Sequence, residues 1–191
     1  EPERAIEIAA HQQRIEHRCR RGLGRREDAE VDAAQDDERQ RQCRHCADET
    51  PEQLAPAAAF ELFTRGIARW WPFRGHSCFG DEAADVVFEP RIGGAVTEVA
   101  RDGARMAWGT LTEWSPPDGF AMRWFPGLDD SEATTLSVRF AAVAGGTAVS
   151  VFHDGWEARG AAAAAKRDQY DGGWPATLAA FCSAADAGMA A

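Results

Sequence analysis

The chain has 191 residues, enough for one domain with an extension, and a formal net charge of −10 at pH 7. Such an acidic chain lacks the clustered basic residues of a nucleic-acid-binding surface, so no nucleic acid partner is expected. No run approaches the roughly 20 apolar residues of a membrane span, and the charged N-terminus has no apolar signal-peptide core. Five irregularly spaced cysteines do not suggest a secreted disulfide framework, and we predict a cytoplasmic protein that does not associate with membranes.

The first part of the chain differs in composition from the rest. Residues 1–50 hold ten Arg, thirteen Asp or Glu and no aromatic residue. Such a stretch buries too little apolar area to offset its ordering entropy. We therefore predict a disordered or loosely helical leader over 1–53 and a folded domain over 54–186.

The leader is not expected to hold a metal. Cys43 and Cys46 have the C-x-x-C spacing of zinc ligands, but no second well-spaced pair accompanies them. We expect neither a metal nor a cofactor.

The folded part opens with helical spacing. Pro56 suits a first helical turn, Phe60, Phe63 and Ile67 recur on one face, and Pro72 ends the pattern. This predicts one amphipathic helix or two short ones.

A series of strands follows. Alternating apolar residues between tight turns predict an antiparallel meander. The strands are expected at 85–89, 95–100, 106–114, 120–125, 134–140 and 147–153.

The C-terminal part is helical. The alanine run 161–165 favours a helix, Gly172 and Gly173 are expected to end it, and Pro175 is expected to begin another. Trp174, Leu178 and Phe181 form one apolar stripe that must cover the sheet.

These motifs together resemble the SRPBCC superfamily, which is birch-pollen-allergen-like, in the branch of activators of the ninety-kilodalton heat-shock chaperone's ATPase. The matching stretches, in family order, are 59–64, Trp70-Trp71-Pro72, 88–94, Trp108-Gly109, 113–117, His153-Asp154-Gly155-Trp156 and 170–174. The resemblance implies an α+β helix-grip fold, in which a curved antiparallel sheet wraps around a long C-terminal helix with two short N-terminal helices. It also implies a ligand cavity between the sheet and that helix.

One feature departs from the family pattern. Family members open with a strand directly before the first helix, but residues 46–53 are acidic, contain Pro51 and do not suggest a strand. A missing strand would leave an edge of the sheet unpaired. Two explanations stay open: a genuine extension, or a leader that is not native to this domain because the reading frame is shifted upstream.

The predicted cavity residues alternate onto the apolar faces of the strands and helix. His153 is the titratable group expected to point inward, either as an acid/base group against a ligand or as a core histidine with hydrogen-bond partners. Trp70 and Trp114 are assigned to the core. The ligand-binding set is Trp71, Phe88, Met106, Trp108, Met122, Trp124, Val151, His153, Trp156 and Trp174.

Three functions are considered. The first is binding of a small apolar or aromatic ligand, the second is a cyclase- or aromatase-like enzyme with His153 as the best catalytic candidate, and the third is regulation of a chaperone ATPase. A sealed core would favour the third, and a cavity with two or more converging polar groups would favour the enzyme. The oligomeric state stays open, with a homodimer as one alternative.

Overall fold

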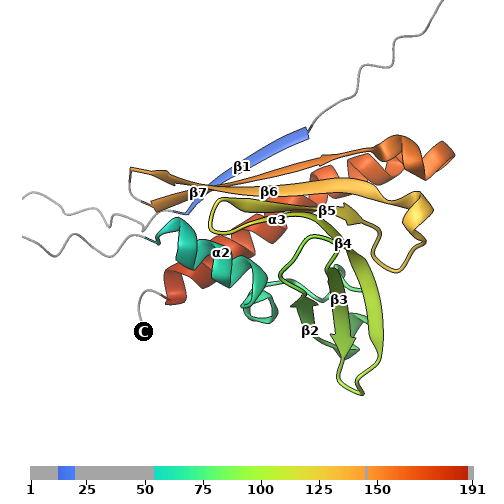
Figure 1. Cartoon of the computed structure of the whole chain (residues 1–191), viewed down its shortest axis with the longest axis horizontal. Helices are drawn as coiled ribbons and strands as arrows, with labels where there is room; N and C mark the ends of the chain where they lie inside the picture. Colours follow the sequence, from blue (N-terminus) through green and yellow to red (C-terminus); the bar gives the residue numbers. More distant parts are fainter. Residues whose placement is uncertain (1–12, 20–53, 145, 189–191) are drawn as a thin grey trace, which may run out of the picture.

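The computed structural model describes residues 13–19, 54–144 and 146–188. Within these residues the strands form one antiparallel seven-stranded sheet in the order β1-β7-β6-β5-β4-β3-β2 (Figure 1). The strands are β1 (Gln13–Cys19), β2 (Ala83–Phe88), β3 (Ala95–Ala100), β4 (Arg105–Ser115), β5 (Gly119–Trp124), β6 (Thr134–Val143) and β7 (Gly146–Asp154).

The meander from β2 to β7 confirms the predicted strand series, because every neighbouring pair in the sheet is also consecutive in the chain. The turns that join them are the glycine- and proline-rich segments seen in the sequence. Gly103, for example, has a φ of +86° in the turn between β3 and β4, a conformation that glycine adopts readily. Together with the C-terminal helix, this sheet confirms the α+β helix-grip fold.

The N-terminal helices are two short pieces. α2 (Pro56–Thr64) begins at the predicted proline, and a 3-10 turn, η1 (Ile67–Arg69), follows it. Arg65 and Gly66 separate them. α2 buries Phe60 and Phe63 against the core, and full burial of a phenylalanine contributes about 2–3 kcal/mol.

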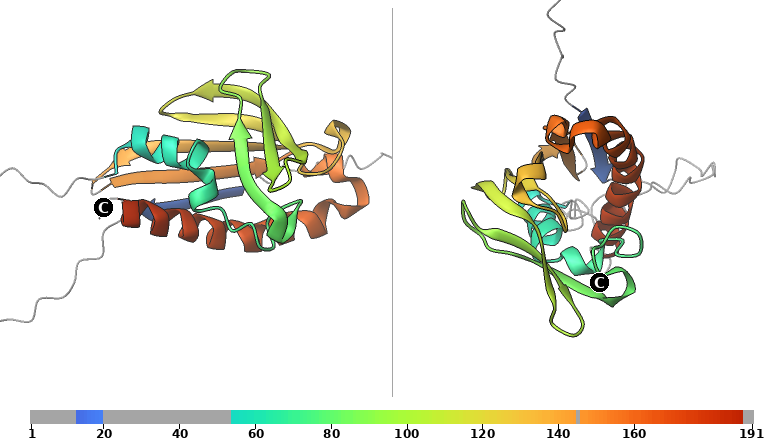
Figure 2. Two further views of the ribbon diagram at one scale, coloured as in Figure 1. Left: turned by 90° about the horizontal axis from the view of Figure 1, so that it is seen from below. Right: turned by 90° about the vertical axis from the view of Figure 1, so that its right-hand side faces the viewer.

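The closing helix is continuous, which corrects the expectation of a break. α3 runs over Ala163–Gly188 and includes Gly172, Gly173 and Pro175. Pro175 removes one helical hydrogen bond and its ring crowds the carbonyl one turn back, but burial of Trp174, Thr177, Leu178, Phe181 and Ala185 along one side outweighs that cost. Figure 2 shows α3 running along one side of the curled sheet, with α2 on the same side.

The opening strand is also a correction. Residues 13–19, expected to be disordered or loosely helical, form β1, which pairs antiparallel with β7 from Gln13 opposite His153 to Cys19 opposite Thr147. An edge strand is held largely by main-chain hydrogen bonds to one neighbour, so it can form without a clear apolar alternation. The sheet edge that was expected to be unpaired is therefore paired, because β1 lies along β7. The domain boundary at residue 53 stays a prediction.

Aromatic side chains fill the core between the sheet and the helices. Phe60 contacts Trp114 edge-on with ring centroids 5.0 Å apart, and Trp70 contacts Phe181 at 5.1 Å. Trp70 belongs to this core, as expected, and the half-buried Trp114 packs against it. Over the described ranges, no helix combines the length and apolar character needed to cross a membrane.

Candidate ligand-binding site

A pocket of about 350 Å³ lies where α3, the loop after η1 and the strands β4 and β5 meet. Ligand pockets typically begin at about 300 Å³. The lining residues are Trp71, Gly75, His76, Ser77, Cys78, Trp108, Trp124, Pro126, Lys166, Gln169, Tyr170, Gly173, Trp174 and Thr177.

Four tryptophans form the buried part of the pocket. Ring centroids are 4.9 Å apart for Trp71 and Trp108, and 5.4 Å for Trp108 and Trp124. Trp174 on α3 lies 6.2 Å from Trp71 and 6.4 Å from Trp124. These tilted and edge-on arrangements are the ones that aromatic quadrupoles favour, so the rings stabilise one another without a ligand.

The indole N–H groups of these tryptophans are all used inside the protein. Trp71 Nε1 donates to the carbonyl of His76 at 2.7 Å, and Trp108 Nε1 donates to Glu98 Oε2 at 2.6 Å. Trp124 Nε1 donates to the Tyr170 hydroxyl at 3.0 Å, and Trp174 Nε1 donates to His153 Nδ1 at 3.2 Å. Because indole has no other polar group, the tryptophans present only carbon surface to the pocket.

Glu98, a fully buried carboxylate on β3, holds the loop that carries the polar side of the pocket. It accepts hydrogen bonds from the Ser77 hydroxyl, from the Cys78 main-chain N at 2.8 Å and from the Phe79 main-chain N at 3.1 Å. Burial raises the pKa of Glu98, but these bonds and that of Trp108 outweigh it and hold the pKa below its ordinary value. The carboxylate is therefore ionised at neutral pH and fixes the loop.

His153 lies behind the pocket, with both ring nitrogens engaged and an exposed fraction of 1%. Its Nδ1 accepts from Trp174, so Nε2 carries the proton and donates to Thr134 Oγ1 at 2.8 Å. Thr134 in turn donates to the Trp124 carbonyl at 3.1 Å. Burial, and then the charge of Arg159, lower the pKa of His153 from 6.5 to about 3, so the ring is neutral at pH 7.

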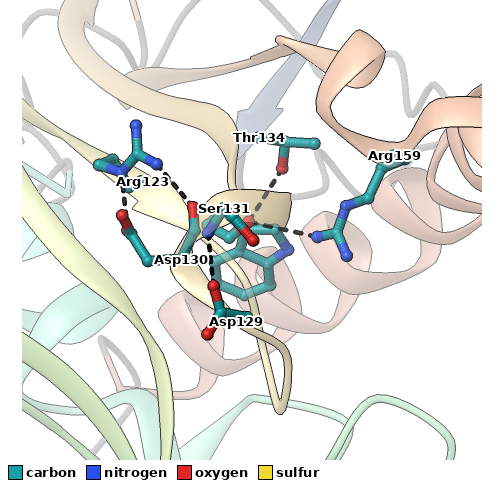
Figure 3. A network of polar contacts seen from close by, with 7 residues as sticks. Arg123, Asp129, Asp130, Ser131, Thr134 and Arg159 are labelled. Atoms are coloured by element: carbon teal, nitrogen blue, oxygen red, sulfur yellow. Dashed lines mark hydrogen bonds and ion pairs between the residues drawn. The ribbon is translucent and has the colours of Figure 1, made fainter.

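The Trp124 carbonyl accepts more than one hydrogen bond in this network. It also accepts a hydrogen bond from Arg159 Nη2 at 3.3 Å, and Figure 3 shows Thr134 and Arg159 converging on one oxygen. On the preceding residue, Arg123 Nε donates to Asp130 Oδ1 at 2.7 Å. The end of β5 is thus held by Asp130 of the loop before β6, by Thr134 at the start of β6 and by Arg159 of the segment between β7 and α3, which fixes the position of Trp124.

The predicted ligand-binding residues divide into two groups. Trp71, Trp108, Trp124 and Trp174 line the pocket together. The others lie outside its lining: Met122, Val151, His153 and Trp156 are buried, Phe88 packs on Phe120, and Met106 is among the exposed large hydrophobic residues. Met106 was expected on the face of Trp108, but register shifts on both sides of β4 interrupt its alternation.

Sequence reasoning missed the polar half of the pocket. Glu98 carried a signal, since it falls between Val96 and Ala100 on the buried face of β3. Tyr170 also carried one, because it lies one helical turn before Trp174. His76 and Lys166 lie on a loop and on an exposed helix face, and no periodicity singles them out.

No three metal-ligating side chains come together in the described ranges, and Cys43 and Cys46 lie outside them.

Comparison with known proteins gives a consistent family signal. Residues 53–185 match the family model described as Activator of Hsp90 ATPase homolog 1-like protein. No curated protein matches the chain.

Several solved structures are similar. The Aha1 dimer from Colwellia psychrerythraea is 15% identical, with a TM-score of 0.51, 70% of this chain and 90% of that chain covered. The anthrahydroquino-gamma-pyrone synthase Txn09 is 30% identical, with a TM-score of 0.49, 69% of this chain and 90% of that chain covered. The AHSA1-like protein from Aeromonas hydrophila is 21% identical, with a TM-score of 0.49, 73% of this chain and 90% of that chain covered.

Proposed function

The chain belongs to the family of Activator of Hsp90 ATPase homolog 1-like proteins, and from this premise we propose that it binds a small aromatic or apolar molecule in the tryptophan-lined pocket. The observation that carries the proposal is the set of four indole rings whose N–H groups are all occupied by the protein. They leave a carbon surface that accommodates a flat ring without leaving a donor unpaired.

The pocket supports ligand binding over a purely structural or interaction role. A sealed core was the expectation for a regulator that acts only through its surface, and an open space of about 350 Å³ does not fit it. Regulation of a chaperone ATPase stays a prediction that rests on the family alone.

A cyclase-like enzyme is the second candidate, and one observation favours it. His76, Lys166 and Tyr170 converge on the pocket, and converging polar groups are what an acid/base reaction needs. His153 is a poorer candidate for direct catalysis than the sequence suggested, because both of its ring nitrogens are occupied outside the pocket lining. Loss of water from a synthetic poly-β-ketone thioester, followed by mass spectrometry, tests this alternative.

The binding proposal is tested with a neutral apolar dye, N-phenyl-1-naphthylamine, whose emission rises on binding. Gly173→Leu fills the pocket, since a Cβ there already lies 3.4 Å from His76 Nε2. Gly172→Leu is the matched control, because its Cβ meets nothing within 4 Å and the neighbouring position has the same helical context. We expect saturable binding that Gly173→Leu weakens at least about tenfold, a loss of about 1.4 kcal/mol, and that Gly172→Leu leaves intact. Absence of saturable dye binding by the unmodified chain would contradict the proposal.

A further inference from the structure

We propose that the ligand is an aromatic anion, with its ring among the indoles and a carboxylate or acidic phenol at the rim formed by His76, Lys166 and Tyr170. This inference rests on the proposed binding function and specifies the chemistry of its ligand. It follows from the polar groups of the pocket that remain available beyond the protein's own hydrogen bonds.

Many polar groups of the lining are already committed. The indole N–H groups are occupied as described above, and the Ser77 hydroxyl donates to Glu98. The Thr177 hydroxyl donates to the Gly173 carbonyl at 3.1 Å, one turn back along α3. These groups hold the pocket together and have no proton left for a ligand.

The groups that remain available are mainly donors. The Tyr170 oxygen accepts from Trp124, and among the described residues no acceptor is recorded for its own O–H proton, which leaves this donor for a ligand. Lys166 uses one of its three protons on the Gln169 side-chain oxygen at 3.3 Å, which also occupies that acceptor and leaves the amide N–H₂ of Gln169. For the imidazole of His76, no hydrogen bond is recorded among the described residues, and the ring offers at least one N–H. A surplus of donors selects a ligand with acceptor oxygens.

The charge of the pocket lining also favours an anionic ligand. The lining includes Lys166, the single lysine of a chain with net charge −10, and it includes no Asp or Glu. The helix acids Asp168 and Asp171 both lie outside the lining, and Asp168 has its own partner in Arg167 at 3.4 Å. Glu98 lies behind the loop, where four donors from that loop and Trp108 surround it. A cationic donor at the rim therefore has no carboxylate of the lining to neutralise it.

The difference in burial between the indoles and the rim residues sets the orientation of the ligand. The four indoles are buried, whereas His76 and Lys166 are exposed and Tyr170 lies between these extremes. An aromatic acid fits this gradient, since its ring loses contact with water while its charged group stays at the solvent side. Charge-assisted hydrogen bonds of this kind are roughly twice as strong as neutral ones.

Three probes of one shape test the inference on the full chain: 2-naphthoate, the neutral 2-naphthamide and the cationic 2-naphthylmethylammonium, with Kd values from ligand-observed NMR. We expect 2-naphthoate to bind at least about tenfold more tightly than the amide, with the ammonium weakest. Lys166→Met should abolish most of this preference. Arg167→Met is the matched control, because it removes the same charge from the next residue of α3, outside the lining, and should leave the preference unchanged.

The outcomes separate the two proposals. Equal or tighter binding of the amide or the ammonium overturns the anion inference and leaves the binding function standing. The same holds if none of the three probes binds while the neutral dye does, or if Arg167→Met lowers the preference as much as Lys166→Met. If neither the probes nor the neutral dye bind, both proposals fail.

Discussion

The indole nitrogen of Trp174 lies 3.2 Å from His153 Nδ1, and this single bond fixes the tautomer of a histidine that is otherwise cut off from solvent. It links a residue of the pocket to the network behind it. Since indole only donates, the bond requires an unprotonated Nδ1, and the network is stable only while the ring is neutral.

The first prediction concerns acid stability. Because the pKa of His153 is about 3 in the folded state and about 6.5 when unfolded, the unfolded chain takes up the proton first as pH falls. The contribution is complete above about pH 6.5 and declines towards pH 3, by up to about 1.4 kcal/mol per pH unit. Urea unfolding at pH 7.5, 6 and 5 measures it, with His153→Gln as the reference that cannot titrate. Parallel curves for the two proteins would contradict the assignment.

The second prediction concerns Glu98. Glu98→Gln replaces one acceptor oxygen by an N–H₂ group that faces donors, so we expect a loss of about 2–4 kcal/mol in the free energy of unfolding. Hydrogen exchange of the Cys78 and Phe79 amides should accelerate with it, because both donate to this carboxylate. Glu89→Gln is the control, since the exposed Glu89–Arg91 pair should contribute under about 1 kcal/mol. Similar losses in both variants would refute the special role of Glu98.

The third prediction uses Tyr170, the single tyrosine of the chain. Burial raises the pKa of this phenol above its ordinary value of 10, even though the bond from Trp124 lowers it. Its stability contribution is present below pH 10 and is lost as pH rises further, because only the unfolded chain ionises readily there. Absorbance at alkaline pH should therefore show a midpoint displaced upward, which falls to about 10 in urea. A midpoint near 10 in the folded protein would contradict this.

The fourth prediction concerns Cys78, a residue of the pocket loop that is exposed as a whole but whose sulfur is partly buried. Partial burial of the sulfur, and then the charge of Glu98, raise its pKa from 9.0 to about 11. Since the thiolate is the nucleophile, we expect alkylation at pH 8 to be on the order of 100-fold slower than for a free thiol. Peptide mapping after timed iodoacetamide treatment measures it, and Glu98→Gln should accelerate the reaction. A rate equal to that of glutathione would show that the thiol is not shielded.

The fifth prediction concerns β1. Removing the residues before Thr50 takes away the strand that pairs with β7 along seven positions, so we expect a lower melting temperature by several degrees and self-association through the bared edge. Thermal unfolding and light scattering of the shortened and full chains make the comparison. Unchanged melting and a monodisperse shortened chain would favour the original expectation of a passive leader.

Local sequence signals predicted the meander within a few residues, because each strand is bounded by a turn of glycine, proline or aspartate. They failed where a contact with a residue distant in the sequence determines whether a strand or helix forms. β1 forms only because β7 is available to pair with it, and α3 continues through Pro175 because Trp174 and Leu178 are buried on both sides of it.

The same limit applied to the candidate site: local patterns in the sequence were informative, but contacts between distant residues could not be predicted from them. Alternation placed Trp108 and Trp124 on the inner face, but it could not place Trp124 beside Tyr170, which lies 46 positions further along the chain. Nor could it show that His153 has both nitrogens occupied, since its partners Thr134 and Trp174 come from β6 and α3. These contacts depend on how the helix lies across the sheet.

The occupied indole N–H groups give the pocket an uneven tolerance to mutation. Each of the four pocket tryptophans donates a hydrogen bond that holds a loop, a strand or the helix in place. Replacing one of them therefore also disturbs the fold. His76 and Lys166 are exposed, and neither side chain has an ion pair recorded within the described part of the chain. Substitution of His76 or Lys166 should therefore change which ligands the pocket prefers with little cost in stability, whereas substitution of any of the four tryptophans should change both.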